Sequence, residues 1–299
     1  MSAARGFVLL ALLTALPAAA GETSARAAAL RELFRPVLAQ PGLGGLPIQA
    51  RVSVSDGVVD CDILAVVARP AAAAKALLGS ARGWCEFALL HHNVKACVEE
   101  PAAEGGRMVI HVGTKHFQPV ELSRPQRYVL RVEGGGGEPL SVRLSPVSAQ
   151  PEESSGPALV EAVDLDEGRT GVRVRYRETL GAGTRLLAAG YFATLGRDKI
   201  GFSTTGVDAE GRTVYVGGLA GAIERNIVRH FFALDTVLEA KAGGAADSPE
   251  QRLSRWFALA ARHALQLHEM DWEEYRDIKL RELAQSEALQ RSIDAQAGE

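Results

Sequence analysis

Short runs in which apolar and polar residues alternate occupy most of residues 94–177. The runs are Val94 to Val98, Arg107 to Val112, Arg127 to Val132, Leu140 to Val147, Leu159 to Leu165 and Gly171 to Arg177. Turn-forming residues, many of them glycines, separate these runs and are typical of hairpin connections. The last run alternates strictly between apolar residues and arginines, from Val172 to Arg177. A period of two predicts an antiparallel sheet with one covered and one solvated face, the three arginines lying on the solvated one.

A helical period follows the strand-like region. Residues 218–240 carry one apolar stripe, made of Leu219, Ile223, Ile227, Phe231, Leu234 and Leu238. Lys241 and two glycines then end the pattern, as expected at a helix C-terminus. This long amphipathic helix is the best candidate to cover one face of the sheet.

The remaining chain divides around these two features. Residues 21–50 contain a short helical patch among prolines and glycines, and we expect an irregular lead-in there. Residues 51–68 are β-branched and strand-like, and two short helices follow between Pro70 and Leu90. An insertion at 180–217 predicts one helix and one hairpin. Residues 246–299 predict a pair of helices, the first capped at Asp247-Ser248 with Pro249 in its first turn.

The N-terminus has the pattern of an export signal. Arg5 precedes a short apolar run up to Leu16, and small residues then predict cleavage after Ala20. The run is shorter than the ~20 residues that cross a membrane. We therefore expect residues 1–20 to be a signal peptide and the mature protein to be periplasmic or secreted.

Composition narrows the classes of function. The 299 residues include 33 Lys and Arg against 36 Asp and Glu, and 47% are hydrophobic. Such a chain is too apolar to be disordered and too weakly charged to indicate nucleic-acid binding. Its three cysteines are too few for a disulfide scaffold.

The cysteines suggest one structural bond. In an oxidising compartment two of the three are expected to pair, and Cys85 and Cys97 flank a short segment that a bond could close. Cys61 lies in a strand-like run and is expected to be a small buried side chain. The alternative, a catalytic thiol beside His91 or His92, needs a positive and accessible site.

The known catalytic and cofactor motifs are missing. The chain has no nucleophile elbow, zinc-protease helix, phosphate loop or dinucleotide fingerprint. His91, His92, His111 and His116 are the histidines to inspect, but they form no set at a metal-ligand spacing. We expect no metal and no cofactor. Residues 268–274, including Glu269, are interpreted as a solvated helix face.

The order of elements carries a resemblance. The chain predicts one strand, two short helices, several antiparallel strands and then a long helix. The two short helices contain Leu77-Leu78-Gly79-Ser80 and Trp84-Cys85-Glu86-Phe87. In this order of elements, residues 50–240 resemble the START and polyketide-cyclase-like (SRPBCC) superfamily. The chain is also similar to exported bacterial proteins of unknown role that carry runs like Asn93-Val-Lys95. The resemblance implies an α+β helix-grip fold at residues 51–245, a curved antiparallel sheet around the long helix with a hydrophobic cavity between them. The insertion 180–217 and the helical extension 246–299 depart from it.

Two functions remain open, with a third beside them. The leading hypothesis is a non-catalytic carrier for an apolar small molecule or lipid, with Tyr176, Ile227 and Phe231 lining the cavity. Its rival is a cyclase or hydrolase that uses a histidine or an acid in the same cavity. The third is an envelope interaction protein that uses the C-terminal helices, or a peripheral association with the envelope. The sequence leaves the oligomeric state open.

Overall fold

The structure is a computed structural model. It describes residues 18–101, 105–133, 139–147, 156–166, 168–194, 196–242 and 248–297, with backbone alone for 18–23. Most of the predicted signal peptide, residues 1–17, and the predicted turn at Gly134 to Gly137 lie outside the described residues.

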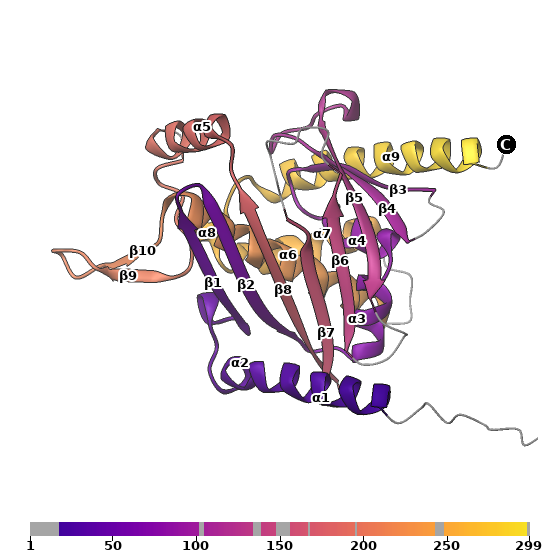
Figure 1. Cartoon of the computed structure of the whole chain (residues 1–299). Coiled ribbons are helices and arrows are strands. Elements are labelled where there is room, and N and C mark those ends of the chain that lie inside the picture. The colour runs from indigo at the N-terminus through magenta and orange to yellow at the C-terminus, as the bar shows by residue number, and fades with distance from the viewer. Residues whose placement is uncertain are drawn as a thin grey trace, which may run out of the picture.

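One antiparallel sheet of eight strands forms the centre of the protein (Figure 1), as the alternating pattern predicts. Its order is β1-β2-β8-β7-β6-β5-β4-β3, and the sheet curves around the helices behind it. The strands are β1 Ile48–Ser55, β2 Val58–Val67, β3 Val94–Glu100, β4 Gly106–Val112, β5 Arg124–Glu133, β6 Leu140–Pro146, β7 Ala158–Asp166 and β8 Arg169–Thr179. The predicted strand-like run at 51–68 divides into two strands at Asp56-Gly57, where φ is 51° and 79°, as a tight hairpin turn requires.

The arginines of β8 lie on the face opposite the main core, as predicted. Each has an acidic partner across a strand: Arg173 with Asp62 at 2.7 Å, Arg175 with Glu161 at 3.6 Å, and Arg177 with Asp60 at 3.3 Å. These pairs satisfy the arginines within the sheet surface.

The segment 21–50 is more helical than the irregular lead-in expected there. The predicted short helical patch lies in helix α1, Ala18–Leu33, and Arg35–Ala39 form α2, followed by the short 3-10 turn η1 at Leu43–Gly45. Leu30 and Phe34 pack against Val66 and Val163 on the arginine face of the sheet. Pro36 occupies the first turn of α2, where a missing N–H costs nothing, so the proline begins this helix.

Helices α3 Ala71–Leu78 and α4 Ala81–Ala88 follow the first hairpin. Cys85 of α4 is bonded to Cys97 of β3, with their Cα atoms 5.1 Å apart, which confirms the predicted pair. Cys61 is buried, as expected.

Removing this bond has an expected cost. The bond joins positions 12 residues apart, so the double variant Cys85→Ala/Cys97→Ala should lose about 3 kcal/mol of unfolding free energy, because the unfolded chain gains freedom. Urea unfolding with and without reductant measures this. Reductant should lower the wild type to the level of the variant and leave the variant unchanged; a wild type insensitive to full reduction would contradict the prediction.

The long helix α6, Gly218–Ala242, lies across the other face of the sheet, against β1, α3 and α4 (Figure 1). Its side chains Val228, Phe232 and Val237 share one hydrophobic core with inward-facing strand residues such as Cys61 and Ile63. A curved antiparallel sheet wrapped around a long helix is the helix-grip arrangement, so the predicted fold class is confirmed.

Two additions extend this core. The insertion forms helix α5, Ala182–Ala193, and a hairpin of β9 Thr204–Val207 and β10 Thr213–Tyr215. The C-terminal extension forms α7 Pro249–Ala261, α8 Ala264–Leu267 and α9 Trp272–Ala297. Ser248 caps α7 by accepting from the N–H of Gln251 at 3.2 Å. No helix in the described ranges has both the length and the apolar character needed to cross a membrane.

Helix α9 closes one edge of the sheet. The Ser286 hydroxyl accepts from the Cys97 N–H at 3.0 Å and donates to the Cys97 carbonyl at 2.9 Å. One turn further on, the Gln290 amide pairs in the same way with Glu99, at 2.8 and 3.1 Å. Two side chains thus take the place of a neighbouring strand, which leaves β3 less open to pairing with another chain.

Candidate functional site

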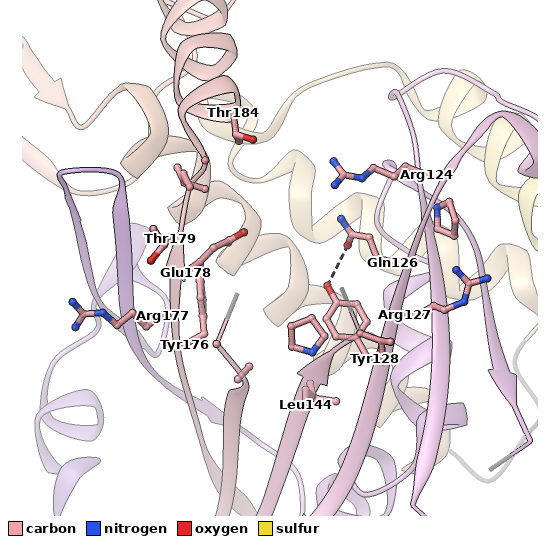
Figure 2. Close-up of a pocket in the computed structure, with 17 residues that line it drawn as sticks. Arg124, Gln126, Arg127, Tyr128, Leu144, Tyr176, Arg177, Glu178, Thr179 and Thr184 are labelled. Atoms are coloured by element: carbon pink, nitrogen blue, oxygen red, sulfur yellow. Dashed lines mark hydrogen bonds between the residues drawn. The ribbon is translucent and has the colours of Figure 1, made fainter. Parts of the chain in front are cut away.

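A cavity of about 620 Å³ opens on the core-facing side of the sheet, between strands β5 to β8 and the start of α5 (Figure 2). Gln126 and Tyr128 reach it from β5, Leu144 from β6, and Tyr176 from β8. Its volume is within the range of ~300–1,000 Å³ that small-molecule sites occupy.

Strand register brings these distant residues to one face. Tyr128 stands opposite Pro146, Leu144 opposite Ala158, and Tyr176 opposite Cys61. Because side chains alternate between faces, every second residue of each strand points to the same side. The cavity wall is therefore assembled from four strands, β5 to β8, whose lining residues are spread from Arg124 to Thr179 in the sequence.

The tyrosines give this wall a neutral, aromatic character. The Tyr128 hydroxyl donates to the Gln126 side-chain oxygen at 3.2 Å (Figure 2). Burial, and then a side-chain hydrogen bond with Cys61, raise the pKa of Tyr176. Burial likewise raises the pKa values of the Tyr128 hydroxyl and the Cys61 thiol. All three groups are therefore protonated at neutral pH, and Cys61 is an unreactive thiol.

Charged side chains stand at the margin of the cavity. Arg124 and Glu178 are on the same face of the sheet as the two tyrosines, whereas Arg127 and Arg177 border the cavity but point away from it, and Arg177 pairs with Asp60 (Figure 2). An aromatic and aliphatic wall with a charged margin suits an amphipathic molecule, whose apolar body contacts the wall and whose polar end stays near Arg124.

The predicted lining residues are only partly brought together. Tyr176 lines the cavity. Ile227 and Phe231 are half-buried on α6, where they pack against the main core, and neither is among the residues that line this cavity. The sequence analysis missed Tyr128, although it lies in a predicted strand with the same alternation that identified Tyr176.

The histidines that the enzyme hypothesis needs lie elsewhere. His91 is buried, with its Nε2 3.3 Å from the Asn226 side-chain oxygen, and its ring stacks on His92 and His230 at 4.5 and 5.0 Å. Burial is the main cause that lowers the pKa of His91 and His92, so these two rings are neutral near pH 7.

The two other histidines are on or near the surface. The His111 Nδ1 is 3.0 Å from the Ser123 hydroxyl, and the exposed His116 is 3.4 Å from Glu274. None of His91, His92, His111 and His116 lines the cavity. Within the described ranges, no three or more His, Cys, Asp or Glu side chains are grouped so that they could hold a metal ion.

Glu269 is not part of a solvated helix face, as the sequence analysis interpreted it. Its carboxylate is buried and contacts Lys199 at 2.6 Å and Arg229 at 3.1 Å, and it also pairs with Arg225 and Lys115. This cluster joins the loop after α5, helix α6 and the segment before α9. It holds these elements together, and none of its residues lines the cavity.

Comparison with known proteins gives structural neighbours only. No family model matches the chain, and no curated protein matches its sequence. Among solved structures it is similar to a STAR-related lipid transfer protein fragment from Xanthomonas axonopodis, at 13% identity, covering 49% of this chain and 94% of that one with a TM-score of 0.31. The Zhui aromatase/cyclase from Streptomyces sp. R1128 has 17% identity, 63% and 99% coverage and a TM-score of 0.37. Human StAR-related lipid transfer protein 5 has 10% identity, 58% and 90% coverage and a TM-score of 0.31.

These similarities are distant. The helix-grip fold is seen in the chain's own arrangement, a curved antiparallel sheet that wraps around a long helix.

Proposed function

We propose that this protein is an exported, non-catalytic carrier that binds an amphipathic apolar molecule or lipid in the cavity between strands β5 to β8 and the start of α5. The observation that carries the proposal is the cavity itself: about 620 Å³, with a neutral wall of tyrosines and aliphatic side chains and a charged margin. Two of the structural neighbours are named as lipid transfer proteins, which supports the same class of ligand.

Two features support export. The N-terminal sequence has the order of a signal peptide, and the Cys85–Cys97 bond is of the kind that persists in an oxidising compartment. We therefore place the mature protein in the periplasm or outside the cell.

Binding can be tested by partly filling the cavity. Ala158 is a small, half-buried lining residue opposite Leu144, so Ala158→Trp should occupy space that a ligand needs. We expect titration with a fluorescent fatty acid to show at least about tenfold weaker binding by this variant than by the wild type.

The matched control makes the same change on the surface. Ala258 is exposed on α7 and is not among the residues that line the cavity, so Ala258→Trp should bind the probe like the wild type. Thermal unfolding checks that both variants fold. A wild type that binds no fatty acid, or an Ala158→Trp variant that binds as tightly as the control, would overturn the proposal. Native mass spectrometry of protein purified from its own host would then identify the bound molecule.

A further inference from the structure

Helix α5 is apolar on all sides and rests almost entirely in solvent. None of its 12 residues is buried. Leu186 and Leu187 are 75% and 77% exposed, and Tyr191 is exposed as well. Arg185 is the only charged residue of the helix. A helix that is hydrophobic all round is normally buried in a protein core or in a membrane, and α5 has no such apolar contacts on most of its surface in the isolated chain.

The helix stands at the opening of the cavity. It follows β8 directly, and its first turn supplies Thr184 to the cavity margin together with Leu180 and Gly181 (Figure 2). From there it extends away from the sheet, beyond the end of β8 (Figure 1). A molecule that leaves the cavity past Thr184 therefore meets the apolar surface of α5.

The second element of the insertion also presents apolar residues. The β9–β10 hairpin projects from the body of the protein (Figure 1), and Val207 and Val214 are exposed on it. Its two strands pair only with each other in the sheet topology of the described residues. The insertion thus adds two projecting elements that expose leucine, valine and tyrosine side chains, and the hairpin also exposes polar residues such as Thr204 and Arg212.

We propose that α5, with the adjacent hairpin, docks the protein on the surface of a lipid bilayer. Twelve helical residues span about 18 Å, short of the ~30 Å hydrocarbon core, so the helix would lie in the interface and not cross it. A protein partner would cover one side of such a helix, whereas acyl chains can surround most of it. The cations at its two ends, Arg185 in the first turn and Arg197 just beyond, suit phosphate headgroups. The inference extends the proposed function, because it places ligand exchange at the membrane.

Vesicle flotation tests the docking without any ligand. The full mature chain is floated with vesicles of phosphatidylcholine alone and of phosphatidylcholine with phosphatidylglycerol. We expect the wild type to float with the vesicles and the variant Leu186→Ser/Leu187→Ser to bind at least about tenfold more weakly, since two leucines no longer enter the apolar layer. Because both side chains are exposed, the variant should fold normally.

The matched control replaces two equally exposed leucines elsewhere. Leu122 and Leu265 are 72% and 69% exposed on η2, Val120–Leu122, and on α8, so Leu122→Ser/Leu265→Ser should float like the wild type. Equal flotation of the two double variants, or a wild type that binds neither kind of vesicle, would overturn the proposal. So would a dimer, seen by light scattering, that only the Leu186→Ser/Leu187→Ser variant loses, because α5 would then contact a second copy of the chain.

Failure here can be told apart from failure of the carrier function. Binding of the fluorescent fatty acid in solution, without vesicles, reports on the cavity alone. A chain that binds the fatty acid but no vesicles refutes docking by α5 and leaves the cavity assignment standing.

Discussion

Replacing Glu282 by glutamine is expected to destabilise the protein by about 3–5 kcal/mol, among the largest effects of any single substitution outside the cavity. Glu282 lies on α9 and is fully buried, as are Lys95 of β3 and Lys279 one turn away. One carboxylate oxygen is 2.7 Å from the Lys95 Nζ, and the other is 2.8 Å from the Lys279 Nζ. Two buried ammonium groups thus share a single carboxylate.

Backbone carbonyls complete the surroundings of the two lysines. Lys95 also donates to the carbonyls of His92 and His116, at 2.8 and 3.1 Å. Lys279 donates to the carbonyls of His91 and Val94, at 3.2 and 2.7 Å. Carbonyl dipoles stabilise a cation but cannot replace a countercharge, so the variant leaves two uncompensated positive charges in the interior.

The pH dependence of stability follows from Lys279. Burial, which the charge of Glu282 only partly offsets, lowers its pKa from 10.5 to about 8. Between these two values the unfolded chain binds more protons than the folded one, so the unfolding free energy of the wild type should rise as the pH is raised from about 8 to 10.5. In Glu282→Gln the folded-state pKa of Lys279 should fall further, and the rise should begin at a lower pH.

Urea unfolding at pH 7 and pH 9 measures both effects. Glu287→Gln on an exposed turn of the same helix is the matched control and should stay within about 0.5 kcal/mol of the wild type. A Glu282→Gln variant less than about 1 kcal/mol below this control would show that the carboxylate does not stabilise the docking of α9.

The sheet and its main helix could be predicted because their local patterns reflect their surroundings. Along β8, Val172, Val174 and Tyr176 face the core while the arginines face the other side, so the period of two is visible in the sequence. The same holds for α6, whose apolar stripe packs into the core. Helices α1 and α2 were predicted only as one short helical patch because the prolines and glycines of this segment indicate breaks, although Leu30, Phe34 and Val37 follow helical spacing.

The cavity could not be predicted from local patterns in the same way. Its wall depends on which residue of β5 stands opposite which residue of β6, and strand register is a long-range property. Tyr176 was identified because its own strand alternates clearly. Ile227 and Phe231 were chosen for their place on the helical stripe, but the cavity is bounded by strands and by α5.

Buried charge was the hardest feature to foresee. The residues of α9 that close the sheet edge, Ser286 and Gln290, are polar, and Lys279 and Glu282 look like members of a solvated face. A charged residue in a helix pattern is usually exposed, and only the three-dimensional packing of α9 on β3 reveals the exception. Glu269 belongs to the same group of exceptions.

Glu269 provides the second prediction, a loss of stability in acid. Burial disfavours its charged form, but the hydrogen bond from Lys199 and the charges of Arg229 and Arg225 outweigh this and lower the pKa of Glu269 from 4.5 to about 2. The folded state therefore holds the carboxylate ionised where the unfolded chain would protonate it. The resulting stabilisation is complete above about pH 5 and is lost as the pH falls from about 4.5 to about 2. Its size is about 2–3 kcal/mol.

Glu269→Gln should therefore lower the unfolding free energy by at least about 2–3 kcal/mol at pH 7, because Arg225 and Arg229 stay buried without their carboxylate. Between pH 5 and pH 2 the variant should show a correspondingly shallower decline than the wild type. The control is Glu273→Gln, at an exposed position in the first turn of α9, which should keep the wild-type acid profile. Urea unfolding at pH 7, 5 and 3 distinguishes the cases. The prediction would be contradicted if the unfolding free energy of Glu269→Gln fell in acid as steeply as that of the Glu273→Gln control. The acid sensitivity would then arise from other carboxylates, and the charge of Glu269 would not stabilise the four cations around it.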